Sequence, residues 1–147
     1  MQKTRGGTLV FVTGILYIIF GAITLVMLAF AIAALGMVGG GALTAPLIIS
    51  LIFPTVVVVF EFGAGIYAVR NAHKLPKAGK LFENAIGLLI IMIISIASEA
   101  YAGSLTVLSF VSLVLPILML VGAGMNKKEA QESGVQIEKS GKKNSQS

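Results

Sequence analysis

The sequence predicts an all-α integral membrane protein, a four-helix bundle built from two antiparallel hairpins and followed by a disordered C-terminal tail. Three observations lead to this fold class. Hydrophobic residues make up 56% of the chain, only 12% of residues are charged, and the mean hydropathy is +0.96. Soluble domains carry about 25% charged residues. The apolar residues also form unbroken blocks, and a block of about 18 or more such residues is a candidate membrane span.

Four apolar blocks define the predicted domain organisation: Thr8–Leu35, Leu47–Val69, Phe82–Ser98 and Leu105–Met125. They form a transmembrane domain over residues 8–125, after a cytoplasmic N-terminus at 1–7. Residues 126–147 are polar and charged, so we expect a disordered cytoplasmic tail. The first block is longer than the roughly 7–15 apolar residues of a signal peptide, so we expect it to remain as a span.

The connections fit a chain that crosses a bilayer back and forth. A glycine-rich stretch, Gly36–Gly41, joins the first two blocks. The second block ends at Arg70, and the third has Glu83 in its first turn, where the helix dipole favours an acidic residue. The short segment Tyr101–Ser104 joins the third and fourth blocks as a tight hairpin.

The basic residues predict the orientation of the spans. Every Lys and Arg lies in the N-terminus, in the middle loop or in the tail. This positive-inside pattern predicts a multi-pass protein of the cell membrane with both termini cytoplasmic. The net charge of +5 therefore reflects topology, and no nucleic-acid partner is expected. The bilayer itself is the expected partner, and four residues of the middle loop are expected to contact anionic lipids: Arg70, Lys74, Lys77 and Lys80.

Small residues mark the expected helix contacts. Gly14 and Gly21 recur seven residues apart on the first block, and Ala29 and Ala33 continue the small surface. On the second block, Gly63 and Gly65 offer a matching surface. Small residues at helical spacing let backbones approach closely in lipid, where no hydrophobic force drives helices together. The surface serves either packing within one bundle or contact between copies in a homo-oligomer.

Two prolines lie near the middle of their spans, each four residues after a serine: Pro54 after Ser50, and Pro116 after Ser112. A proline leaves the carbonyl four residues earlier without its helical hydrogen bond and usually kinks the helix. We expect a structural kink, or alternatively a hinge or polar site. The shared Ser-to-Pro spacing also raises the question of a duplicated hairpin, which the sequence leaves open.

Glu61 is the only charged residue inside the four blocks apart from Glu83 at a helix start. A charge at the bilayer centre costs roughly 2.5–3.5 kcal/mol on insertion scales. At 1.5 Å per residue, Glu61 lies roughly 13 Å from the edge marked by Arg70, near the middle of the bilayer. The same depth on other spans is reached at Tyr17 and Pro116, with Ser112 about one turn beyond, so these three residues are the expected neighbours. No basic residue lies at this depth, so we expect Glu61 to keep its proton near neutral pH.

Nothing in the sequence predicts catalysis. It holds no catalytic triad, phosphate loop or paired carboxylates on one span, so no catalytic residue and no cofactor are assigned. The chain has no cysteine, and nothing near His73 has metal-ligand spacing, so no metal site is expected either. Glu99, beside Tyr101 at the outer end of the third block, is expected to be an interfacial anchor or, alternatively, a residue that attracts cations.

A short stretch resembles a known pattern. Residues Glu61–Asn71 and Lys74–Ala78 combine an acidic residue, a Gly-Ala-Gly element, a basic-Asn pair and a Lys-Pro loop. This resembles the second span and loop of small, uncharacterised four-span membrane proteins of Gram-positive bacteria. The resemblance implies a bacterial cytoplasmic membrane and four spans, and it implies no activity.

Two functional hypotheses follow. The first is a non-enzymatic accessory subunit or small oligomeric scaffold that acts through helix–helix contacts with a membrane-protein partner or a second copy. In this case Glu61 forms a sealed hydrogen bond, for example to Tyr17. The second is a proton- or cation-coupled transporter or channel for a small solute, in which Glu61 exchanges protons. The scaffold is the leading hypothesis at this stage.

Overall fold

The computed structural model describes residues 4–38, 45–101, 103–104 and 106–137. Within these residues every regular element is helical: α1 (Gly7–Val38), α2 (Ala45–Asn71), the 3-10 turn η1 (Leu75–Lys77), α3 (Ala78–Tyr101), α4 (Val107–Val111) and α5 (Val114–Glu132). Four helical segments are long and apolar enough to cross a membrane, and the fourth runs from Ser109 in α4 to Glu132 at the end of α5. The prediction of an all-α protein with four apolar spans is therefore confirmed.

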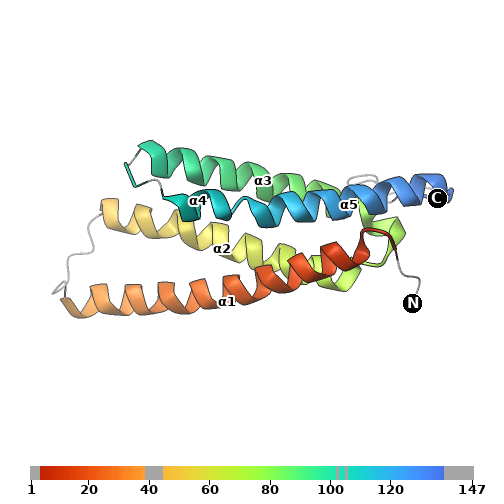
Figure 1. Ribbon diagram of the computed structural model, residues 1–147. Coiled ribbons are helices and arrows are strands. Elements are labelled where there is room, and N and C mark those ends of the chain that lie inside the picture. The colour runs from red at the N-terminus through yellow and green to blue at the C-terminus, as the bar shows by residue number, and fades with distance from the viewer. Residues whose placement is uncertain (1–3, 39–44, 102, 105, 138–147) are drawn as a thin grey trace, which may run out of the picture.

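The helices form a bundle in which the chain reverses direction from one long helix to the next (Figure 1). The most extensive contacts are those of α1 with α2 and of α3 with α5, and α1 also packs against α5. Helices α2 and α3 touch much less. Figure 1 shows the helices close together at the end that holds the two termini and farther apart at the opposite end.

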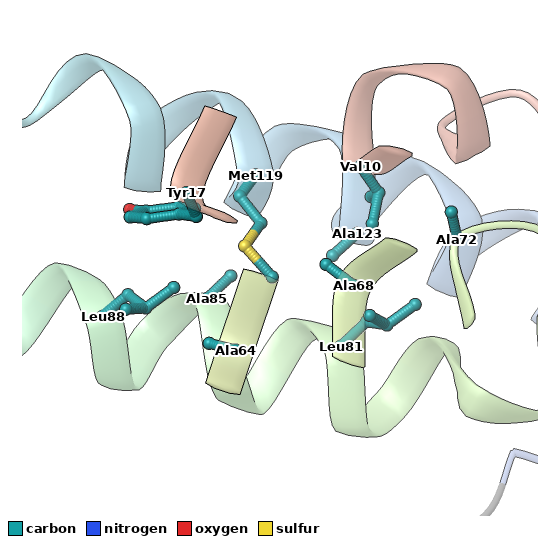
Figure 2. Close-up of a cluster of buried hydrophobic side chains, with 10 residues drawn as sticks. All are labelled: Val10, Tyr17, Ala64, Ala68, Ala72, Leu81, Ala85, Leu88, Met119 and Ala123. Atoms are coloured by element: carbon teal, nitrogen blue, oxygen red, sulfur yellow. The ribbon is translucent and has the colours of Figure 1, made fainter. Parts of the chain in front are cut away.

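The buried core lies in the half of the bundle that holds the termini. It combines several alanines with a few larger side chains from α1, α2, α3 and α5 (Figure 2): Val10, Tyr17, Ala64, Ala68, Ala72, Leu81, Ala85, Leu88, Met119 and Ala123. Along α1 the last buried residue is Gly21, and along α3 it is Leu88. The small alanine side chains bring the backbones close in this half, whereas the far half has few buried positions.

The fourth span is not one continuous helix. It is interrupted at Ser112 and Leu113, between α4 and α5. The interruption places Pro116 in the first turn of α5, where its missing N–H costs nothing because first-turn amides have no partner within the helix. In contrast, α2 is continuous through Pro54. The two Ser-to-Pro elements therefore differ in backbone structure.

The end of α5 differs from the sequence prediction, which placed the start of a disordered tail at residue 126. The helix continues to Glu132, and Ala123, Asn126 and Ala130 are fully buried. The charged residues between them lie on the other faces of the helix, so the segment is amphipathic rather than apolar. Hydropathy marks only the apolar part of such a helix. Residues 138–147 of the predicted tail lie outside the described residues.

Asn126 joins three parts of the chain at this end of the bundle. Its Oδ1 accepts a hydrogen bond from the N–H of Gly6 at 2.9 Å, and its Nδ2 donates to the carbonyl of Ala72 at 2.7 Å. It therefore links α5 to the start of α1 and to the end of α2. Nearby, the N–H of Arg5 donates to a carboxylate oxygen of Glu129 at 2.7 Å.

We expect Asn126→Leu to destabilise the bundle although leucine has a similar size. The substitution removes two hydrogen bonds and leaves buried polar groups of Gly6 and Ala72 with weaker or no partners, at a cost of about 1–3 kcal/mol. Thermal unfolding in detergent, followed by circular dichroism, measures the effect. Gln131→Leu on the exposed face of α5 is the control. An equal Tm for both variants would contradict a structural role for Asn126.

Candidate functional site

All four spans contribute to one half-open cavity between the helices. Its volume is about 430 Å³, and its lining combines one carboxyl and two hydroxyl groups with apolar side chains: Tyr17 and Phe20 of α1, Glu61 of α2, Met92 of α3, and Val111, Ser112, Val114 and Leu115 around the α4–α5 break. Three residues that sequence depth predicted to be neighbours, Tyr17, Glu61 and Ser112, thus line the same cavity. Known ligand sites commonly have volumes of about 300–1,000 Å³.

Glu61 is half-buried and unpaired. Within the described part of the chain it has no hydrogen bond and no ion pair, and Tyr17 is only 2% exposed with a hydroxyl that also lacks a hydrogen-bond partner. The hydrogen bond from Glu61 to Tyr17 that the scaffold hypothesis expects is therefore absent from this arrangement. Glu61, which lines the cavity and is only half-buried, is therefore available to a ligand or to water, whereas the Tyr17 hydroxyl is buried without a partner.

Glycines position Tyr17 and Glu61. A Cβ atom at Gly65 would lie 2.9 Å from the carbonyl oxygen of Gly14 and 2.9 Å from the Cβ of Tyr17. These distances are shorter than van der Waals contact, so only glycine allows α1 and α2 to approach this closely. Tyr17 follows Gly14 by three residues and Glu61 precedes Gly65 by four, so each lies about one helical turn from the contact. Farther along, Gly21 packs against the ring of Phe62.

The other predicted packing residues lie elsewhere. Gly63 has nothing within 4 Å of the position a Cβ would take, and Ala29 and Ala33 are exposed on the far half of α1. The small-residue surface of α1 thus contacts α2 only as far as Gly21. The reason is geometric, because α1 and α2 are packed most closely near Gly14 and have no buried residue on α1 beyond Gly21.

Ser112 and Pro116 lie at the break between α4 and α5. The Ser112 hydroxyl donates to the carbonyl of Ser109 at 2.6 Å, and Pro116 is fully buried. On α2, Pro54 belongs to a continuous helix, and the side chain of Ser50 lies outside the described part of the structure. Tyr17 and Ser112 therefore line the cavity with Glu61, whereas Pro54 and Pro116 are not part of its lining.

The basic loop residues lie at the end of the bundle that holds the termini. The Nζ of Lys74 donates to Oδ1 of Asn71 at 3.3 Å, and Arg70 is exposed. Lys74 and Lys77 help to line a shallow cavity of about 360 Å³ beside η1, and Lys80 follows on α3. Among the described residues, no group of three or more His, Cys, Asp and Glu side chains could hold a metal ion.

Several residues of the site were not predicted from the sequence. Phe20, Met92 and Leu115 line the cavity, but an apolar residue in an apolar span gives no signal that separates a cavity wall from a lipid contact. Asn126 did carry a signal, because an asparagine directly after Gly122–Met125 extends the small-residue face of that helix. The charged residues that follow Asn126 lower the hydropathy of the segment, and the pattern was therefore assigned to the tail.

Comparison with protein-family models, with curated proteins and with solved structures finds no match to this chain.

We expect Gly65→Ala to destabilise the bundle and Gly63→Ala to leave it unchanged or slightly more stable. Both substitutions add one methyl group to the same helix, but only the methyl at residue 65 meets α1, and overpacking of this kind costs about 1–3 kcal/mol. Unfolding in mixed detergent micelles measures the difference. Equal stability of the two variants would show that the close approach at Gly14 is not needed for folding.

Proposed function

We propose that this chain is a non-enzymatic integral membrane protein that acts as a proton- or cation-coupled transporter of a small solute, with Glu61 as the ionisable group. The observation that carries the proposal is the cavity between the four spans, into which Glu61, Tyr17 and Ser112 converge. Glu61 has no protein partner within the described residues, which supports an exchanging group over a sealed structural hydrogen bond.

The chemistry of the cavity wall favours one class of cation. Tyr17 and Phe20 supply aromatic rings, Met92 supplies a polarisable thioether, and the carboxyl of Glu61 is the only acidic or basic side chain among the described residues of the lining. Aromatic faces attract organic cations, and methionine adapts to ligands of different shape. A Ca²⁺ or Mg²⁺ ion takes about six to eight oxygen ligands, more than one carboxyl and two hydroxyls supply. We therefore infer that the cavity takes an organic monocation with an apolar body.

A single carboxyl is enough to couple such a cation to protons. A protonated Glu61 has no charge to attract the cation, and a bound cation disfavours protonation. Each ligand therefore lowers the affinity for the other by the same factor. Movement of one against the other across the membrane is a direct consequence of this competition, provided that the cavity opens in turn to each side.

The proposed topology places both termini and the middle loop in the cytoplasm of a cell membrane, with the spans arranged as two antiparallel hairpins. Its support is that the described basic residues lie just before α1, from the end of α2 to the start of α3, and in the last part of α5, and Figure 1 shows these segments at the same end of the bundle. This end would face anionic lipids. The resemblance of Glu61–Ala78 to four-span proteins of Gram-positive bacteria fits the same topology.

One prediction of this proposal concerns the protonation of the Glu61 carboxyl. Difference infrared spectra of the protein in lipid, with Glu61→Gln subtracted, should show a carboxyl band that titrates between about pH 5 and about pH 9, because protons and water reach the cavity. Glu83→Gln, which removes an exposed carboxyl of α3, should leave this band unchanged. A Glu61 band that stays protonated throughout would overturn the proposal and favour the accessory-subunit or oligomeric-scaffold hypothesis.

Another prediction of this proposal concerns the binding of an organic cation. Benzyltrimethylammonium should bind to the purified protein more tightly as pH rises through the titration of Glu61. Glu61→Gln should weaken binding by about tenfold or more, since a carboxylate about 4 Å from a cation attracts it by about 4 kcal/mol at an effective dielectric constant of about 20. Isothermal titration calorimetry measures both effects, with Glu83→Gln as control. Binding that is independent of pH and of Glu61 would contradict competition at this site.

A further inference from the structure

A second cavity lies at the end of the bundle away from the termini. Its volume is about 540 Å³, and its wall comes from α3 and the segment that follows it: Met92, Ser95, Ile96, Glu99, Ser104, Thr106, Ser109 and Ser112. One carboxyl and five hydroxyl groups therefore face one space. Polar groups are costly in hydrocarbon unless they are hydrogen-bonded, so a wall of this composition implies water. A cavity of this volume holds several water molecules at about 30 Å³ each.

The polar groups form a connected chain. The Ser109 hydroxyl donates to a carboxylate oxygen of Glu99, and the Thr106 hydroxyl lies 3.1 Å from the same Ser109 oxygen. The Ser112 hydroxyl donates to the carbonyl of Ser109 at 2.6 Å. The hydroxyl links thus run from Glu99 to Ser109 and Thr106, and Ser112 joins them only through the Ser109 carbonyl, so a proton needs water to pass between the hydroxyls of Ser109 and Ser112.

The outer cavity and the Glu61 cavity share two wall residues, Met92 and Ser112. On α3, the outer wall follows one helix face from Met92 to Glu99, a distance of about 10 Å along the axis. The two cavities are therefore stacked along the bundle and meet at the level of Ser112. Met92 is the apolar residue at this junction.

We propose that the outer cavity is the external access route by which protons reach Glu61, with Glu99 as the residue that collects them. This inference rests on the proposed function of Glu61. A hydronium ion in the outer cavity gives its proton to the Glu99 carboxylate. The proton then passes through water and the hydroxyls of Ser109 and Ser112, each of which accepts one proton and releases another. The net change is that the Glu61 carboxylate becomes the acid and the hydronium ion becomes water.

The groups that could influence this transfer are few. Among the described residues, Glu61 and Tyr17 are the titratable side chains that line the Glu61 cavity, and Glu99 is the one that lines the outer cavity. The sequence holds no other Asp, Glu, His, Lys or Arg between Gly6 and Val69, and none between Ala100 and Asn126. No basic residue therefore lies close to either cavity on α1, on α4 or on the spanning part of α2.

The test is the rate at which Glu61 changes protonation after a pH jump, followed by time-resolved infrared spectroscopy of the protein in nanodiscs. We expect Glu99→Gln and Ser112→Val each to slow this rate by about tenfold or more. A positioned proton-transfer group contributes about 10²–10⁴-fold, and water that still enters the cavity reduces the loss. The equilibrium titration of Glu61 should change little in Glu99→Gln. On α3, Glu99 lies about two helical turns beyond Met92, the α3 residue that lines the Glu61 cavity.

Glu83→Gln is the matched control, since it makes the same substitution on the same helix at the opposite end. An unchanged rate in both Glu99→Gln and Ser112→Val, with Glu61 still titrating, would overturn the outer route and leave the proposed function intact. Equal slowing in Glu83→Gln would also overturn it, because the effect would then not be local. A Glu61 that never titrates in the unsubstituted protein would instead overturn the proposed function.

Discussion

The close approach of α1 and α2 at Gly14 and Gly65 is the contact on which the rest of the site depends. Lipid supplies no hydrophobic force between helices, so they must associate through tight packing and polar contacts. Two glycines remove the side chains that would hold the backbones apart. As a consequence, Tyr17 and Glu61 are fixed one turn from the contact, at a common depth. A wider separation of α1 and α2 would leave Glu61 facing lipid instead of a cavity.

The bundle is built differently in its two halves, and the difference determines where the cavities lie. At the end with the termini, alanines pack between the helices and Asn126 joins three backbone segments by hydrogen bonds. On α1 and α3 the buried positions end at Gly21 and Leu88, and farther along the bundle Val58 and Ser109 are buried. Tyr17 lies close to this boundary. The Glu61 cavity therefore lies where the closely packed half ends, and the outer cavity lies in the loosely packed half.

The sequence predicted the spans and the grouping of Tyr17, Glu61 and Ser112 because both depend on hydropathy and on the constant rise of a helix. It did not predict the course of α5 beyond Met125 or the break before Val114. The first depends on which face of an amphipathic segment finds a partner, and the second on where a proline can join a helix start. Both are decided by tertiary packing, to which local hydropathy is insensitive. For the same reason the shared residues Met92 and Ser112 could not be identified as a junction.

The α4–α5 break gives the fourth span a role that an unbroken helix could not fill. In a continuous helix, Pro116 would leave the carbonyl of Ser112 without its helical hydrogen bond within the span. The break instead places a turn beside the Glu61 cavity, and non-helical backbone at membrane depth is tolerated where it is buried in protein or lines a cavity. It also lets Ser112 belong to both cavities. In the proposed external route, the turn between α4 and α5 therefore lies at the point where the two cavities share their wall.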